Sequence, residues 1–164
     1  MKTLCILRHA KSSWNEPDLS DHDRVLNKRG LRDAPRMGAQ LVARGIAPDA
    51  FVSSTAVRAR NTARLAMEAM GIDIDQCELR EDLYLASARG IAAVAAEASD
   101  TVNTQLLCGH NPGMTDVVSL LTDDDFAHLP TAGLVILALD IDRWADVYPG
   151  CAQLVYFDYP KGLA

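Results

Sequence analysis

The chain has 164 residues, a formal net charge of −6 and a hydrophobic fraction of 49%. Its length is that of one ordinary domain, and its composition is typical of a globular protein, which excludes a disordered or fibrous chain. The apolar runs are shorter than the ~20 residues of a membrane-spanning helix, and the run after Lys2 stops at Arg8 before a secretory pattern develops. We therefore expect one domain over residues 1–164, cytoplasmic, monomeric and without contact to a membrane.

The charged residues are divided unevenly along the chain. Residues 1–64 carry 12 Lys and Arg against 6 Asp and Glu, whereas residues 65–164 carry 4 against 16. The net acidity argues against nucleic acid as a partner, because a nucleic-acid binder needs a broad basic face. A local excess of basic residues instead suits a small anionic group bound at one site.

Neither the cysteines nor the histidines have the spacing of a metal site. The chain lacks Cys-x-x-Cys, His-x-His and His-Glu-x-x-His patterns, and His22 and His128 fall in polar segments. We therefore predict no metal and no other cofactor. Buried free thiols in a reducing compartment are expected for the four cysteines, Cys5, Cys77, Cys108 and Cys151.

In the first half of the chain, apolar runs alternate with helical patterns. The expected order is a strand, a long polar connection, a helix, a strand and a second helix, at residues 3–7, 10–26, 28–44, 50–53 and 56–70. Gly45 and Gly71 are placed to end the two helices. Pro35 falls inside the first helical pattern, where it should either bend the helix or mark its first turn.

The second half continues the alternation. It predicts a short strand at residues 76–79, a loop at 81–86 and a helix capped by Ser87. A strand at 104–108, a helix ending near Leu121 and two antiparallel strands at 134–140 and 153–156 follow. Strands that alternate with helices indicate an α/β fold. We expect a three-layer sandwich, with a mainly parallel central sheet and helices on both faces.

Polar residues with catalytic potential follow three of the predicted strands. Arg8 and His9 end the first strand, Arg58 lies in the first turn of the helix after the second, and His110 follows the strand that ends near Cys108. The carboxyl ends of parallel strands share one edge of a sheet, where ligands gather. Two arginines and two histidines at one edge would form an anion site around a nucleophile.

The residues around these positions carry a family resemblance. The opening Arg8-His9-Ala10, the block Ser-Ser-Thr-Ala-x-Arg-Ala-Arg-x-Thr-Ala at 53–63 and Gly-His-Asn-Pro-Gly at 109–113 resemble the histidine phosphatase (phosphoglycerate mutase-like) superfamily. The segments at 11–14, 23–30 and 33–37 resemble, more narrowly, the SixA-type phosphohistidine phosphatases. The similarity extends from Leu4 to about Thr131. The chain departs from the pattern at Ala10, where the broader superfamily usually has Gly, and at Val25, where SixA-type chains commonly have Pro.

The resemblance implies roles for individual residues. His9 matches the nucleophile that becomes transiently phosphorylated, and the phosphate-pocket residues are matched by Arg8, Arg58 and His110. Glu81 is the best positional match for a proton donor, with water, a substrate that is already protonated, or an aspartate among Asp18, Asp21 and Asp23 as alternatives. Residues that line the substrate site are expected among Ser12, Trp14 and Asn111.

The function that the resemblance implies is hydrolysis of a phosphoryl group carried by a histidine of another protein. The expected partner is a phosphorylated protein, either a histidine phosphotransfer domain or a carrier protein. A chain of this length leaves little room for a lid, so the site should be shallow enough for a protein surface to approach. The alternatives are a broad-specificity phosphatase of small phosphate esters and a catalytically inactive module that binds a phosphorylated ligand.

Overall fold

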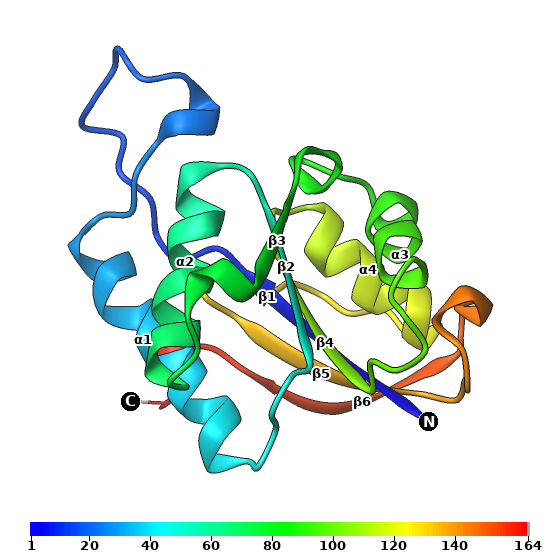
Figure 1. Ribbon diagram of the computed structural model, residues 1–164. Helices are drawn as coiled ribbons and strands as arrows, with labels where there is room; N and C mark the ends of the chain where they lie inside the picture. Colours follow the sequence, from blue (N-terminus) through cyan, green and yellow to red (C-terminus); the bar gives the residue numbers. More distant parts are fainter. Residues whose placement is uncertain (164) are drawn as a thin grey trace.

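The computed structural model describes residues 1–163 and contains one six-stranded sheet with the order β3-β2-β4-β1-β5-β6 (Figure 1). Strands β1 to β4 are parallel, whereas β5 is antiparallel to both β1 and β6. The predicted α/β fold with a mainly parallel sheet and an antiparallel final pair is therefore confirmed. The strands are β1 (Lys2–Arg8), β2 (Ala50–Ser54), β3 (Cys77–Arg80), β4 (Thr104–Gly109), β5 (Leu134–Leu139) and β6 (Ala152–Asp158).

Helices cover both faces of the sheet. One pair, α1 (Lys28–Ala43) and α2 (Val57–Ala69), lies on one side, and the other pair, α3 (Ala88–Ala96) and α4 (Gly113–Thr122), lies on the opposite side (Figure 1). In β1, Cys5 and Leu7 belong to the core beneath α1 and α2, whereas Leu4 and Ile6 belong to the core beneath α3 and α4. Successive side chains of a strand point to opposite faces, so a strand buried on both sides requires a continuous apolar run.

The ends of the helices follow the predicted signals. The Ser87 side chain accepts a hydrogen bond from the Gly90 N–H at the start of α3, as a capping residue does. Gly45 and Gly71, which follow α1 and α2, have φ values of +70° and +76°. Pro35 lies inside α1, well beyond the first turn, so the alternative that it begins the helix is wrong.

Several connections contain short 3-10 turns that the sequence pattern does not predict, and two of them lie near the predicted site residues. Turn η1 (Asp21–Asp23) interrupts the long polar connection, and η3 (Glu81–Leu83) begins the segment predicted as a loop. In η3 the Tyr84 N–H donates to the Glu81 carbonyl, which closes the turn. Within residues 1–163, every helix is too short or too polar to cross a membrane. The four cysteines are free, and three of them are buried.

The strand order brings the predicted site residues to one edge. Strand β4 lies between β2 and β1, with Gly109 opposite Arg8 and Cys108 opposite Ser53. Because these three strands are parallel, their carboxyl ends lie next to one another. The connection between β1 and α1, drawn in blue in Figure 1, protrudes from this edge of the sheet.

Candidate active site

His9 is held in one orientation immediately after β1. Its backbone N–H donates to the Gly109 carbonyl, and its ring Nδ1 lies 2.7 Å from the Ala10 carbonyl oxygen. A carbonyl only accepts hydrogen bonds, so Nδ1 carries the proton and Nε2 keeps its lone pair. Burial lowers the pKa of His9 to about 3, and the ring is therefore neutral at neutral pH. A neutral imidazole with a free Nε2 is a competent nucleophile.

A buried hydroxyl connects this segment to helix α2. Thr62 Oγ1 accepts a hydrogen bond from the Ala10 N–H at 2.9 Å and donates to the Arg58 carbonyl at 2.7 Å. Ala10 in turn provides the carbonyl that holds the His9 ring. The position of the His9 ring is therefore coupled to the first turn of α2, which carries Arg58.

His110 lies against His9, with 5.2 Å between the ring centroids. Only 2% of its surface is exposed, and its Nε2 lies 2.8 Å from Ser54 Oγ at the end of β2. We assign the serine hydroxyl as the donor, which leaves the ring proton on Nδ1. Burial and the nearby Arg58 charge lower the pKa of His110 to about 4.

Arg58 is enclosed between the sheet edge and turn η1. Its side chain is 4% exposed, and its Nη1 and Nη2 donate to the backbone carbonyl and the side-chain Oδ2 of Asp21, the latter at 2.9 Å. The Tyr84 hydroxyl donates to the same Oδ2, and the Tyr84 ring packs edge-on against His110. The hydrogen bond from Tyr84 and the Arg58 guanidinium hold the pKa of Asp21 at about 2.

Arg8 and Asn111 converge on one carbonyl from the opposite side of the site. Arg8 Nη1 and Asn111 Nδ2 donate to the Leu129 carbonyl oxygen at 3.1 and 2.9 Å. The side-chain oxygen of Asn111 accepts from both the N–H and the hydroxyl of Thr115. The Asn111 amide is therefore engaged in fixing the segment before β5, while its side chain also lines the hollow described below.

Three buried polar atoms of the described residues lack a hydrogen-bond partner, and all three belong to this cluster. They are Arg8 Nε, Arg58 Nε and His110 Nδ1. Buried N–H groups without partners are rare in proteins because each costs free energy. The cluster thus contains three unsatisfied N–H donors, two from guanidinium groups and one from an imidazole, whose hydrogen bonds a bound anion would complete.

The remaining predicted residues lie outside these contacts. Glu81 is exposed in η3, after β3, and its carboxylate makes no hydrogen bond or ion pair within residues 1–163. Ser12 is buried beneath the protruding connection, where its hydroxyl accepts from Arg24, so it is not open to a substrate in this geometry. Trp14 is 73% exposed, and the Arg24 guanidinium stacks over its ring at 3.2 Å.

Sequence reasoning missed the residues that support the central four. Ser54 and Thr62 lie inside the block at 53–63, but nothing in the sequence connects them to His110 or Ala10. Tyr84 follows Glu81 by three positions and gives no signal of its own. Asp21 is among the acidic residues considered as proton donors, whereas the structure pairs it with Arg58.

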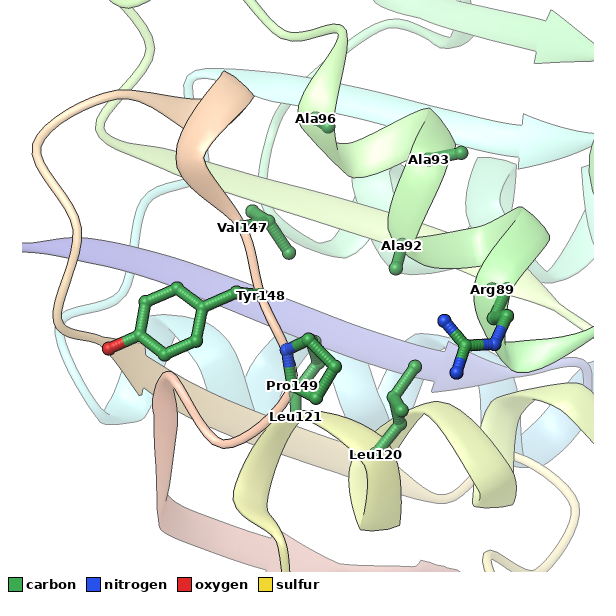
Figure 2. A pocket seen from close by; sticks show the side chains of 9 residues that line it. All are labelled: Arg89, Ala92, Ala93, Ala96, Leu120, Leu121, Val147, Tyr148 and Pro149. Carbon is green, nitrogen blue, oxygen red and sulfur yellow. The ribbon is translucent and has the colours of Figure 1, made fainter.

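One hollow adjoins the cluster, and another lies away from it. The first, of about 450 Å³, adjoins the site and is lined by Arg8, Asn111, Pro112, Thr115, Asp116, Ala127 and His128. The second, of about 210 Å³, lies between α3, α4 and the segment after η4 (Trp144–Asp146), and Figure 2 shows Arg89 and Tyr148 at its two ends. None of the predicted site residues lines the second hollow.

Comparison with known families decides the affiliation. The family model described as histidine phosphatase superfamily (branch 1) matches residues 4–114, which contain His9, Arg58 and His110. The chain belongs to the histidine phosphatase superfamily. Together with the SixA phosphohistidine phosphatases among the solved structures described below, this family makes the chain a phosphoryl hydrolase, in agreement with the resemblance seen in the sequence blocks.

Relatives of this histidine phosphatase include an uncharacterised protein of Mycobacterium tuberculosis. The two are 37% identical over 166 residues, which cover 94% of this chain and 100% of the relative. A chloroplastic protein of Arabidopsis thaliana, also uncharacterised, is 28% identical over 159 residues, and the match covers 90% of this chain and 71% of the relative. The match spans the whole Mycobacterium relative but only part of the longer Arabidopsis relative, and neither name identifies a substrate.

Solved structures confirm the resemblance to the SixA type. A SixA-type protein from Agrobacterium tumefaciens is 28% identical, with a TM-score of 0.81 and coverage of 97% of this chain and 98% of its own. The protein histidine phosphatase SixA complexed with tungstate has a TM-score of 0.84 at 18% identity, with 99% of each chain covered. The second comparison shows the shared fold.

Proposed function

We propose that this phosphatase removes a phosphoryl group from a phosphohistidine of another protein, with His9 as the transiently phosphorylated nucleophile. The observation that carries the proposal is the set of three buried, unpartnered atoms, Arg8 Nε, Arg58 Nε and His110 Nδ1, next to the neutral His9 ring. A phosphoryl group offers three oxygens to these donors, and its phosphorus would then face His9 Nε2.

In the first step, His9 Nε2 attacks phosphorus in line with the leaving nitrogen of the substrate. A P–N bond to His9 forms as the P–N bond of the substrate breaks, and the leaving imidazole nitrogen takes up a proton. Arg8, Arg58 and His110 hold the equatorial oxygens and stabilise the charge of the transition state. The Ala10 carbonyl keeps the proton of His9 on Nδ1 and stabilises the positive charge that the ring acquires.

In the second step, water attacks phosphorus, the P–N bond to His9 breaks, and inorganic phosphate leaves. The leaving group of this step is the neutral His9 imidazole, whose Nε2 regains its lone pair. An imidazole in water has a pKa of about 6.5, so a histidine nitrogen needs less help from an acid to leave than an alkoxide does. Such a substrate is compatible with Glu81 as donor and equally with water in that role.

A protein substrate is favoured by two observations. The hollow lined by Arg8, Asn111 and His128 is open on the surface beside the cluster, so a phosphohistidine presented on a protein could reach it. The SixA-type neighbours are named phosphohistidine phosphatases, and those from Agrobacterium tumefaciens and Nakamurella multipartita are each 28% identical to this chain.

The test is to incubate the enzyme with a protein that carries ³²P-labelled phosphohistidine and to look for acid-labile label on the enzyme. We expect the wild type to release phosphate and to acquire label, and His9→Ala to do neither. The proposal is wrong if the wild type takes up no label while His9→Ala turns over equally well. A kcat/KM that favours small phosphate esters over the phosphoprotein would support the broad-specificity alternative.

The role of Glu81 is tested by the leaving group. We expect Glu81→Gln to lower kcat on an alkyl phosphate by about a hundredfold or more, and on a phosphoramidate by much less, because general acid catalysis matters most for a poor leaving group. Equal losses on the two substrates would exclude Glu81 as the donor.

A further inference from the structure

We infer that Asp21 is the positioning residue for Arg58 and that turn η1 fixes the orientation in which Arg58 binds the phosphoryl group. The inference rests on the proposed function, because it assigns a supporting role within the same site. It concerns turn η1, which contains none of the four residues Arg8, His9, Arg58 and His110.

The contacts of the Arg58 guanidinium divide into two sets. Its two terminal nitrogens donate to Asp21, one to the backbone carbonyl and one to Oδ2 at 2.9 Å. Its Nε is buried and has no partner. A guanidinium is a planar fork of donors, so fixing both terminal nitrogens also fixes the direction of the Nε–H. Asp21 therefore binds the two terminal nitrogens of Arg58 and leaves the Nε–H for the ligand.

Asp21 is itself held from two further directions. The Tyr84 hydroxyl donates to Oδ2, and Arg24 Nη1 donates to Oδ1 at 3.2 Å. Arg24 is buried and also donates to the Ser13 carbonyl at 3.2 Å, which ties η1 to the base of the protruding connection. The carboxylate is thus fixed between two arginines and a tyrosine, although 45% of its surface is exposed.

Two other roles for Asp21 have different chemical requirements. A proton donor must be protonated before the reaction, whereas the hydrogen bond from Tyr84 and the charge of Arg58 lower the pKa of Asp21 and keep it ionised at neutral pH. A carboxylate that blocks the anion site would accept hydrogen bonds from the Nε–H groups of Arg8 and Arg58. The unpartnered Nε atoms of Arg58 and Arg8 show that Asp21 leaves these donors open.

The experiment uses the full-length protein and four variants. Asp21→Asn removes the charge at nearly constant size, Asp21→Glu restores it, and Tyr84→Phe removes one hydrogen bond to Asp21. Glu16→Gln is the matched control, because Glu16 belongs to the same connection but its exposed carboxylate makes no hydrogen bond or ion pair within residues 1–163. The measurements are the dissociation constant of tungstate by calorimetry, kcat/KM on an aryl phosphate, an alkyl phosphate and a phosphoramidate, and the melting temperature.

We expect Asp21→Asn to weaken tungstate binding and to lower kcat/KM about ten- to a hundredfold, the range for loss of a charge-assisted hydrogen bond. The loss should be the same for all three substrates, because a positioning residue acts on the phosphoryl oxygens and not on the leaving group. Tyr84→Phe should act in the same direction with a smaller loss, and Asp21→Glu should recover part of the activity. Glu16→Gln should match the wild type, and all melting temperatures should remain close to that of the wild type.

Three results would overturn the inference. Tighter tungstate binding by Asp21→Asn would identify Asp21 as a competitor of the anion. A loss that grows from aryl to alkyl phosphate would identify a proton donor, and unchanged binding and turnover would exclude any role. If Asp21→Asn does not fold, Tyr84→Phe decides by the same criteria. A wild type that neither binds tungstate nor releases phosphate would overturn the proposed function, and this inference with it, whereas an active wild type with an unaltered Asp21→Asn overturns this inference alone.

Discussion

At the scale of single residues, burial determines the chemistry of His9 and His110. Both rings lie behind the sheet edge, with 8% and 2% of their surfaces exposed. Removing an imidazolium from water is unfavourable, and Arg8 and Arg58 add positive charge nearby, so both pKa values fall. In the same environment, Arg8 Nε, Arg58 Nε and His110 Nδ1 have no hydrogen-bond partner. The proposed nucleophile and the proposed anion site therefore depend on the same buried, positively charged cluster.

The lowered pKa values predict a loss of stability in mild acid. In the unfolded chain each histidine binds a proton below about pH 6.5, whereas in the folded protein His9 and His110 remain neutral down to about pH 3 and 4. Acid therefore favours the unfolded state. The free energy of unfolding should fall by about 2 kcal/mol per histidine between about pH 7 and 5.

Urea unfolding of the wild type and His9→Asn at several pH values measures this effect. The variant should lose about half of the pH dependence that the two buried histidines contribute. Equal slopes for wild type and His9→Asn would contradict the prediction.

At the scale of elements, the contact between α1 and α2 depends on a glycine. A Cβ added at Gly38 would lie 2.1 Å from the Ala66 carbonyl oxygen, so the two helices approach more closely than any side chain permits. Helix α2 carries Arg58 in its first turn, and α1 begins where the connection that contains Asp21 ends. The packing of the two helices therefore supports the position of Arg58 and of the connection that contains Asp21.

We predict that Gly38→Ala lowers the free energy of unfolding by about 1–3 kcal/mol, because α1 must move away from α2 to make room for the methyl group. Gly90→Ala in α3 is the matched control. Its new Cβ would lie 3.4 Å from the nearest atom, Ser87 Oγ, so the substitution should be neutral or stabilising by up to about 1 kcal/mol. Denaturant titration of both variants measures the difference, and equal stabilities would contradict it.

At the scale of the whole molecule, one sheet separates two apolar cores. Leu4 and Ile6 of β1 contribute to one core, and Cys5 and Leu7 contribute to the other. Because β1, β2, β4 and β5 each contribute buried residues to both cores, loss of either core removes the packing on one face of the sheet. The two sides should therefore unfold together, as a single domain over residues 1–164 would.

The two tryptophans provide a test of this cooperativity. Trp144 is fully buried in the core beneath α3 and α4, where its Nε1 donates to the Val102 carbonyl, whereas Trp14 is exposed. In Trp14→Phe, the fluorescence of Trp144 reports on one core, and far-UV circular dichroism reports on the helices of both faces. We expect the two urea transitions to coincide. Separate midpoints would indicate that the two sides unfold independently.

Most of the fold could be predicted from local pattern. The apolar run of β1, the caps at Ser87, Gly45 and Gly71, and the alternation of strands and helices are properties of short segments, and each is found in the structure. The sequence also predicted which corners carry Arg8, His9, Arg58 and His110, because parallel strands place their carboxyl ends at one edge. The 3-10 turns at Asp21 and Glu81 escaped this reasoning, since a single turn has no periodicity.

The sequence by itself therefore determined the strands and the helices, and it predicted that Arg8, His9, Arg58 and His110 lie at one edge of the sheet. Only the tertiary structure decided what supports those residues, because Asp21 meets Arg58 across 37 positions of sequence and His110 meets Ser54 across 56. Such pairs depend on strand order and on the path of a long connection, neither of which is written in local periodicity. Burial is decided in the same way, and with it the pKa values of the two histidines, because the dielectric environment of a side chain belongs to the packed molecule.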